Sequence, residues 1–448
     1  MRKLVKSLAV VFVLLAGVGI QPAVSNAERD PARPNMIILF ADDMGYGDLS
    51  CYGHPTIDTP NLDRLAQQGT RFEAFYTGSW CVPSRTQLLT GRYRSRMNFK
   101  GSTGANGNGR LPPGETTLAE GLNSAGYSTH MLGKWHLGHA KDSYLPTGHG
   151  FDTWFGIPYS NDYKKPFVQT DVPLGLYQGT EMVEHPIDQD TLTTRYTQRA
   201  VERIQAESGK DEPFFLYLAY AMPHLPIHTA DRFRGQSGHG LYADVIETID
   251  WSVGRIMKTL EARGLAENTI VFFASDNGPW LNLPGRMLQA GNKPWHQGTT
   301  GGLRGAKATT FEGGHRVPAI IRWPGHIEAN VDTETPTASQ DIFLTMMHAG
   351  GATLPEKPMD GYNLLPWLTG KQETSPRDYY YYEFSGTLAA YRKGPWKLRL
   401  NGNKPQLFNL ESDPASRYNR INDKPEVAER MRKHMKKAAK EIKASMPN

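Results

Sequence analysis

Four strand-like segments of this 448-residue sequence, three of them strongly apolar, are each followed directly by polar residues, and this pattern constrains the fold most. The segments span residues 36–41, 127–132, 214–222 and 269–275, and helical patterns separate them. Alternating strands and helices predict an α/β fold with a large mixed, mostly parallel sheet flanked by helices. Ligands of such sheets bind beyond the carboxyl ends of the strands. We therefore expect the four polar clusters to meet at one edge of the sheet.

The four clusters contain side chains suited to metal binding and acid–base chemistry. Any one cluster could be an ordinary polar turn or a helix cap, but four in succession favour a site. Carboxylate and amide oxygens suit Ca²⁺ or Mg²⁺ better than zinc, and crowded carboxylates repel one another without a cation. The residues are, in chain order, Asp42, Asp43, Lys134, His136, His224, Asp276 and Asn277.

A fifth segment, residues 81–92, places a cysteine at the expected start of a short helix. The N-terminus of a helix attracts an anion through its backbone N–H groups and its dipole, and Arg85 could add a charge-assisted contact. Cys81 is compatible with a reactive thiolate and equally with a small buried side chain. Neither reading explains why a cysteine should lie beside a hard cation.

The first 27 residues are predicted to be a signal peptide. Arg2, Lys3 and Lys6 precede an apolar run over residues 8–20, and small residues end the segment near Ala27. The run is short for a membrane span, so we expect export to the periplasm or the medium and no membrane anchor. Removing this segment lowers the formal net charge from +5 to +2.

Charge and cysteine content exclude several classes of protein. The positive charge concentrates in the tail, residues 424–448, so no nucleic-acid-binding surface is expected. Apolar residues recur in this tail at helical spacing, which predicts a docked amphipathic helix; polyanion binding by its basic face stays open. Two cysteines in the whole chain exclude a disulfide scaffold and a cysteine-rich metal domain.

The composition shifts near residue 370. We therefore divide the mature chain into a catalytic domain, residues 28–370, and a C-terminal subdomain, residues 371–448, with a small antiparallel sheet and the terminal helix. The Gly- and Asn-rich residues 101–109 do not stand between a strand and a helix, so we interpret them as a flexible surface loop rather than a phosphate-binding loop.

The motifs together resemble those of the type I sulfatases. Cys-x-Pro-Ser-Arg followed by Leu-Leu-Thr-Gly-Arg, residues 81–92, is similar to the family signature. Supporting motifs are Asp42-Asp43 and the segments 133–138, 223–224, 275–278 and 307–314. The resemblance covers residues 35–410 and is strongest to the arylsulfatase A and N-acetylgalactosamine-6-sulfatase branch.

This resemblance implies an alkaline-phosphatase-like fold and a defined chemistry. Cys81 would be converted to Cα-formylglycine by a maturation enzyme, and the aldehyde hydrate would attack the sulfur of a sulfate ester. One Ca²⁺ would be bound by the residues that match the family's ligands: Asp42, Asp43, Asp276, Asn277 and the modified Cys81. Arg85, Lys134 and Lys307 would hold the nucleophile or the sulfate, and His136 and His224 would transfer protons.

The expected activity is hydrolysis of sulfate monoesters, of a sulfated carbohydrate and also of aryl sulfates. Residues 279–302, with Trp280, Trp295 and His296, are predicted to form a specificity loop, and His149 and His239 are further rim candidates. Two alternatives stay open: a phosphomonoesterase or phosphonate hydrolase of the same superfamily, and a non-catalytic glycan-binding homologue.

Overall fold

The computed structural model describes residues 33–99, 101–400 and 404–446, and its core is a ten-stranded mixed sheet. The strand order is β12-β2-β11-β9-β1-β8-β4-β5-β6-β7. The five strands from β9 to β5 are parallel, which confirms the predicted fold class. The strands of this sheet are β1 (Asn35–Ala41), β2 (Thr70–Phe72), β4 (Ser128–Gly133), β5 (Thr153–Gly156), β6 (Leu176–Gln178), β7 (Glu181–Glu184), β8 (Phe214–Ala219), β9 (Thr269–Ser275), β11 (Ala319–Arg322) and β12 (Val331–Thr333).

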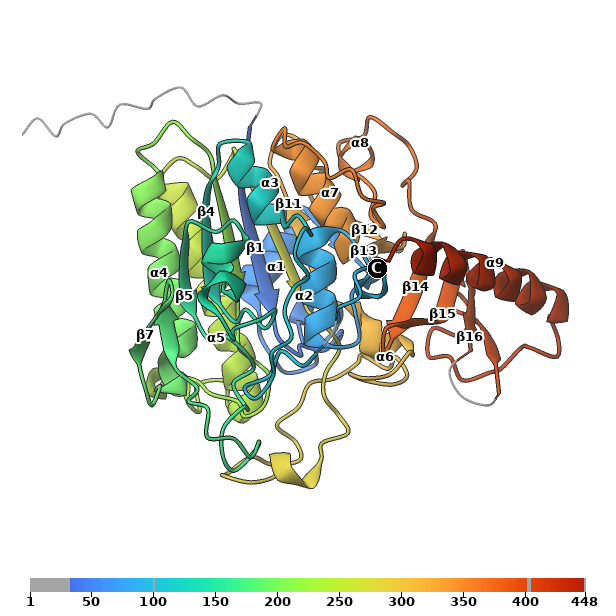
Figure 1. Cartoon of the computed structure of the whole chain (residues 1–448), viewed down its shortest axis with the longest axis horizontal. Helices are drawn as coiled ribbons and strands as arrows, with labels where there is room; N and C mark the ends of the chain where they lie inside the picture. The colour runs from blue at the N-terminus through green and yellow to red at the C-terminus, as the bar shows by residue number, and fades with distance from the viewer. Residues whose placement is uncertain (1–32, 100, 401–403, 447–448) are drawn as a thin grey trace, which may run out of the picture.

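Helices cover both faces of this sheet (Figure 1). In β1, Ile37 and Leu39 face the core that includes α1, α4 and α5, whereas Ile38 and Phe40 face the core that includes α2, α3 and α7. Because both faces are buried, β1 is apolar at every position after Asn35. The helices are α1 (Pro60–Gln67), α2 (Cys81–Thr90), α3 (Leu118–Ser124), α4 (Leu192–Glu207), α5 (Leu241–Ala262), α6 (Glu312–His315), α7 (Ser339–Ala349), α8 (Leu365–Leu368) and α9 (Pro425–Ala444).

Local sequence signals set the ends of several helices. Thr117 and Glu120 form a reciprocal capping box at the start of α3. Gly91 ends α2 with φ 68°, a left-handed conformation that favours glycine. Pro425 occupies the first turn of α9, where its missing N–H costs nothing. These signals explain why α3 and α9 begin, and α2 ends, where they do.

Two smaller sheets complete the described structure. One has the order β10-β3-β13, with β3 (Phe75–Tyr76), β10 (Arg316–Val317) and β13 (Thr337–Ala338). The other is antiparallel, with the order β14-β15-β16-β17, and comprises β14 (Tyr379–Phe384), β15 (Thr387–Lys393), β16 (Trp396–Arg399) and β17 (Gln406–Asn409).

The antiparallel sheet and α9 lie together at one end of the molecule (Figure 1). Met431 and Met435 of α9 pack against a tyrosine-rich core that includes Tyr381 and Tyr391. The predicted docked amphipathic helix is therefore present. The division of the chain at residue 370 stays a prediction.

The structure does not describe the N-terminal segment. The expected signal peptide, residues 1–27, lies outside the described residues. Among the residues that are described, no helix has both the length and the apolar character to cross a membrane.

Candidate active site

The register of the central strands brings the four polar clusters to one edge of the sheet. Ala41 of β1 pairs with Ser275 of β9, and both strands end there. Phe40 and Gly133 both pair with Ala219 of β8, so β4 and β8 end at the same level. The predicted meeting of the clusters is thus observed, and it follows from parallel pairing of strands that are far apart in the sequence.

Strained backbone accompanies this edge. Asp43, His136 and Ala308, which follows Lys307, have φ angles of 67°, 64° and 67°. Few residues other than glycine adopt this left-handed region, and such strain persists only where the surroundings enforce it. Three such residues next to the polar clusters indicate that the fold retains a strained backbone here in order to position side chains.

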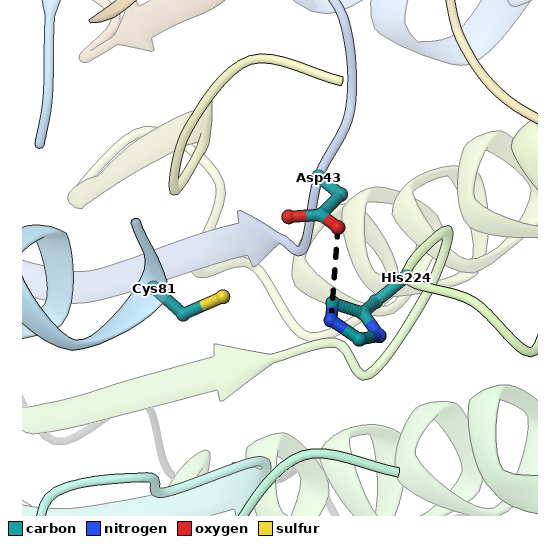
Figure 2. Close-up of side chains that lie close together, drawn as sticks. All are labelled: Asp43, Cys81 and His224. Carbon is teal, nitrogen blue, oxygen red and sulfur yellow. Dashed lines mark ion pairs between the residues drawn. The ribbon is translucent and has the colours of Figure 1, made fainter. Parts of the chain in front are cut away.

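Oxygen and sulfur atoms converge at the centre of the site. Ligand atoms of Asp42, Asp43, Cys81 and Asp276 all lie within 4.8 Å of one another, and all four residues are buried. Figure 2 shows the Cys81 side chain, the Asp43 carboxylate and His224 lying close together, with the ion pair between Asp43 and His224 drawn. Asp42, Asp43, Asp276 and the modified Cys81 are all among the metal ligands that the sequence predicts.

Asn277 supplies a further test of that prediction. Its side-chain Nδ2 donates to Asp43 Oδ1 at 2.7 Å. This hydrogen bond identifies the other end of the amide as the oxygen, Oδ1. This Oδ1 is buried and has no hydrogen-bond partner among the described residues. A buried oxygen without a donor is costly, and a hard cation would satisfy it. The donor set therefore fits Ca²⁺ or Mg²⁺.

Burial and neighbouring charges set the three carboxylates apart. Burial alone would raise the pKa of Asp42, but Lys134, His224 and Arg85 outweigh it and hold this pKa well below its usual value. Burial and the charge of Asp42 raise the pKa of Asp276 to about 7. Carboxylates packed this closely do not all ionise readily, which is the situation that a bound cation relieves.

Three basic side chains surround the acidic group. Lys307 Nζ donates to both oxygens of Asp43, at 2.7 and 2.8 Å, and Lys134 Nζ donates to Asp42. Arg85 donates from Nε and a terminal nitrogen to Asp276 Oδ2, at 3.2 and 3.0 Å. The carboxylate partners keep all three cations charged in a buried place, where they can attract an anionic substrate.

Cys81 is the first residue of α2 and only 5% exposed. Its Sγ lies 3.3 Å from Asp42 Oδ1 and 3.5 Å from Lys307 Nζ. Burial, together with Asp276 and Asp42, raises the pKa of the thiol well above its usual value. An unmodified Cys81 beside these carboxylates is therefore a protonated thiol and a poor nucleophile.

The two predicted acid–base histidines are both buried at this edge. His224 Nε2 lies 3.7 Å from Asp43 Oδ2, and its Nδ1 lies 2.6 Å from the Leu225 carbonyl oxygen. Burial lowers the pKa of His224, and Lys307 and Lys134 lower it further. His228, four residues after His224, is instead paired with Asp190 at 2.8 Å and does not line the cavity at Cys81.

A cavity of about 280 Å³ opens onto Cys81. The predicted residues His136, His224 and Lys307 line it, and so does Trp280 of the predicted specificity loop. A cavity of this size accommodates one small group of a substrate rather than a long chain. Further lining residues are Trp80, Val82, Arg94, Gly101, Ser102, Thr103, Ser160, Asp162, Tyr163 and Arg286.

This cavity corrects the interpretation of residues 101–109. They form a loop that is exposed at Gly101, Ser102, Asn106 and Asn108, but Gly101, Ser102 and Thr103 also line the cavity, and Thr103 to Ala105 are buried. A side chain at position 104 would collide with the ring of Tyr163, which lines the same cavity. The glycines thus allow close packing beside the site and do not mark a loose connection.

Other rim candidates lie elsewhere. His149 is buried and its ring packs against Trp135, with 5.5 Å between the ring centroids. His239 is exposed, and Trp295, 70% exposed, is absent from the lining of the cavity. His296 is buried but is also absent from that lining. Of the aromatic residues predicted for the specificity loop, only Trp280 faces the cavity.

The sequence analysis missed Ser160 and Asn161. Ser160 Oγ accepts from Lys134 Nζ at 3.2 Å, and Asn161 Oδ1 lies 3.1 Å from His224 Nδ1. Both follow β5, which is only four residues long. The signal was present, since a short apolar run precedes Ser-Asn-Asp, but so short a strand does not stand out by periodicity.

Comparisons with known proteins agree with this geometry. The "Sulfatase" family model matches residues 34–352, and the model "N-sulphoglucosamine sulphohydrolase, C-terminal" matches residues 306–445. The chain belongs to the sulfatase family. As the motifs suggested, this sulfatase lies in the branch of arylsulfatase A and N-acetylgalactosamine-6-sulfatase.

Individual relatives cover most of this sulfatase. Arylsulfatase G of Rattus norvegicus is 37% identical over 88% of this chain and 83% of its own length. N-acetylgalactosamine-6-sulfatase of Mus musculus is 39% identical over 83% of this chain and 72% of its own length. The crystal structure of Ps i-CgsB in complex with k-i-k-neocarrahexaose superposes with a TM-score of 0.79, at 29% identity, over 91% of this chain and 93% of that one.

Proposed function

We propose that this sulfatase hydrolyses sulfate monoesters of a carbohydrate, and aryl sulfates as smaller substrates, with a formylglycine made from Cys81 and one bound Ca²⁺. The convergence of Cys81 with three buried carboxylates inside a ring of basic side chains carries this proposal. The relatives named N-acetylgalactosamine-6-sulfatase and the oligosaccharide complex of Ps i-CgsB support a carbohydrate substrate.

Calcium would be held by Asp42, Asp43, Asp276, Asn277 and the side chain of residue 81, and as a Lewis acid it would polarise the sulfuryl oxygens. Formylglycine, as its hydrate, would supply a nucleophilic hydroxyl and a second hydroxyl through which sulfate can later be expelled. The maturation enzyme would have to reach Cys81 before the chain folds, because Cys81 is only 5% exposed afterwards.

The chain's own residues provide the remaining chemistry. Lys134 and Lys307 place positive charge where negative charge grows on the transferred group, and Arg85 fixes Asp276. His224, which lines the cavity beside Lys307, would donate a proton to the departing alcohol oxygen. His136, neutral because burial lowers its pKa, would accept a proton from residue 81.

Mass spectrometry tests the proposal most directly. The tryptic peptide Phe72–Arg85 from active protein of the native host should carry the aldehyde at position 81. An unmodified thiol throughout active protein would refute the proposed nucleophile. The Cys81→Ala variant should lose hydrolysis, whereas undiminished function of this variant would indicate a glycan-binding protein.

Matched esters separate the sulfatase from the phosphatase alternative. The converted enzyme should hydrolyse 4-nitrophenyl sulfate faster than 4-nitrophenyl phosphate. A single metal ion with Lys134 and Lys307 suits the one negative charge of a sulfate ester. Faster hydrolysis of the phosphate would overturn the assignment.

We also propose that the protein is exported and cut near Ala27. Residues 2–20 carry the expected basic and apolar regions of a signal peptide. N-terminal sequencing of the mature protein tests this, and a first residue at Met1 would contradict it.

A further inference from the structure

An arginine-lined cavity lies apart from the active site. It measures about 680 Å³ and lies between α4 and α5. Its lining includes Arg195, Arg199, Arg232 and Arg255 and no acidic residue. It shares no lining residue with the cavity at Cys81. Four guanidinium groups around one hollow without a carboxylate form a concentrated positive field.

Aromatic rings hold these arginines in place. Arg232 lies over the rings of Phe233 and Trp251, with 4.7 and 4.5 Å to the ring centroids. Arg195 and Arg199 lie over the ring of Phe155, at 5.5 and 5.0 Å. Stacking fixes a guanidinium without using its N–H groups, which stay available for an anion.

Few carboxylates neutralise the arginines of this cavity, which we call the arginine groove. Arg195 pairs with Glu184 at 2.6 Å, and Arg199 has a longer, exposed pair with Glu202 at 3.6 Å. Arg232 and Arg255 form no ion pair within the described part of the chain. Their charges are therefore free to act on a ligand.

The cavity continues along α4. A second cavity, of about 520 Å³, shares Phe155 and Arg199 with the first and adds Arg203, together with the acidic residues Asp152 and Glu202. Arg195, Arg199 and Arg203 are spaced four residues apart, so they line one side of the helix over about 12 Å. A row of this length suits an extended anionic chain better than a single ion.

We propose that this arginine groove binds a sulfated polysaccharide as a site separate from the catalytic cavity. The catalytic cavity, about 280 Å³, has room for little more than the reacting unit, so the rest of a polymer must lie outside it. Planar guanidinium forks match the oxygen geometry of sulfate groups. The choice of a sulfated glycan rests on the proposed function, whereas the anion-binding character rests on the arginines alone.

The experiment compares two double variants with equal loss of charge. Arg199→Ala with Arg255→Ala removes two exposed arginines of the groove, and Lys433→Ala with Lys436→Ala removes two exposed lysines of α9. Figure 1 places α4 and α9 at opposite ends of the molecule. Binding is measured with chondroitin 6-sulfate, with unsulfated hyaluronan and with duplex DNA, together with the hydrolysis of 4-nitrophenyl sulfate.

The arginine variant should bind chondroitin 6-sulfate at least about tenfold more weakly, since two charge-assisted contacts are lost. The lysine variant should bind within about twofold of the parent, and both should hydrolyse 4-nitrophenyl sulfate at the parent rate. Unchanged binding of chondroitin 6-sulfate by the arginine variant, or equal weakening in both variants, would overturn the proposal that the groove is a binding site. Equally tight, arginine-dependent binding of DNA or hyaluronan would overturn the choice of a sulfated glycan.

The two proposals fail in different ways. Binding that does not depend on the arginines, with intact hydrolysis of 4-nitrophenyl sulfate, would refute the groove and leave the proposed function standing. Arginine-dependent binding without any sulfate-ester hydrolysis by converted protein would remove the proposed function instead.

Discussion

Burial decides the protonation state of both histidines at the catalytic edge. His136 and His224 lie among Lys134, Lys307 and Arg85, and burial together with these cations lowers both pKa values. A neutral imidazole is the form that accepts a proton. His224 must therefore gain its proton only when a substrate's negative charge enters the cavity.

The first prediction concerns the two histidines that lie close together in sequence. His224→Ala should lower kcat/KM for 4-nitrophenyl sulfate by roughly 10²- to 10⁴-fold, because the leaving oxygen loses its proton donor. His228→Ala is the matched control, since His228 pairs with Asp190 away from the cavity, and its kcat/KM should stay near the parent value. Steady-state kinetics that rank the two variants the other way would contradict the assignment.

The second prediction concerns pH. A histidine with a lowered pKa stays neutral to lower pH, so the acid limb of kcat/KM should lie below pH 6.5, the ordinary value for histidine. At saturating calcium, where protonation of Asp276 does not limit metal binding, the rate should fall only as the pH drops through the lowered pKa of His136. A profile of kcat/KM between pH 4 and 8 checks this, and an acid limb above 6.5 would exclude His136 as the base.

At the residue scale, the sequence indicated the chemistry where a motif or a long strand preceded it. Asp42 and Asp276 follow long apolar runs and were predicted, and both lie at the acidic centre. Ser160 was missed because β5 is short. The place of residues 101–103 was misjudged because composition does not reveal which surface a loop covers.

At the scale of elements, two adjacent parallel strands carry most of the acidic group. β1 ends at Asp42 and Asp43, and β9 ends at Asp276 and Asn277. Their side-by-side pairing fixes the spacing of the carboxylates before any metal arrives. A preformed acidic site of this kind binds a cation at the expense of bound protons.

The third prediction follows from the pKa of Asp276, which burial and Asp42 raise to about 7. Near pH 6 this carboxyl is mostly protonated and opposes metal binding, whereas at pH 8 it is mostly ionised. Calcium affinity should therefore rise by up to about tenfold per pH unit below 7, with proton release, in calorimetric titrations. Asp276→Asn should bind calcium weakly and without this pH dependence; a pH-independent affinity of the parent would contradict the prediction.

A second element-scale feature is the buried contact between α6 and the antiparallel sheet. Glu312 accepts hydrogen bonds from Tyr76, Tyr382 and Lys397, at 2.8, 2.5 and 2.7 Å. Burial alone would raise the pKa of Glu312, but Lys397 and Arg392 outweigh it and lower this pKa to about 2. The ionised carboxylate therefore joins the C-terminal sheet to the catalytic region.

The fourth prediction tests this contact. Glu312→Gln should lower the free energy of unfolding by about 3–5 kcal/mol, because the buried Lys397 loses the carboxylate that favours its charged form. In the parent the contribution should be complete above pH 4.5 and lost as the pH falls towards 2. Urea unfolding checks both statements; exposed Glu429→Gln, the control, should change stability by less than about 0.5 kcal/mol. Equal stability of the two variants would contradict the role of Glu312.

Element by element, the sequence predicted the long strands and helices but missed the two-residue strands of the three-stranded sheet. β1, β8 and β9 are six or seven residues long and apolar in their interiors, so their pattern is unambiguous. β3, β10 and β13 have two residues each and are held by pairing with distant segments. Tertiary contacts of that kind leave no local signal.

At the scale of the whole molecule, positive charge is distributed over two remote regions. The basic face of α9 and the arginine groove along α4 lie at opposite ends of the molecule (Figure 1). Only the basic tail was evident from the sequence, because the arginines of the groove come from three separate segments. Their meeting depends on how α4 packs against α5.

The central place of β1 has a consequence for the newborn chain. β1 is complete at Ala41, but its neighbours β8 and β9 begin only at Phe214 and Thr269. At ordinary rates of translation, β9 follows β1 by on the order of ten seconds or more. During that interval the apolar strand β1 has neither partner, so the emerging chain must be shielded from aggregation until its last central strand has been made.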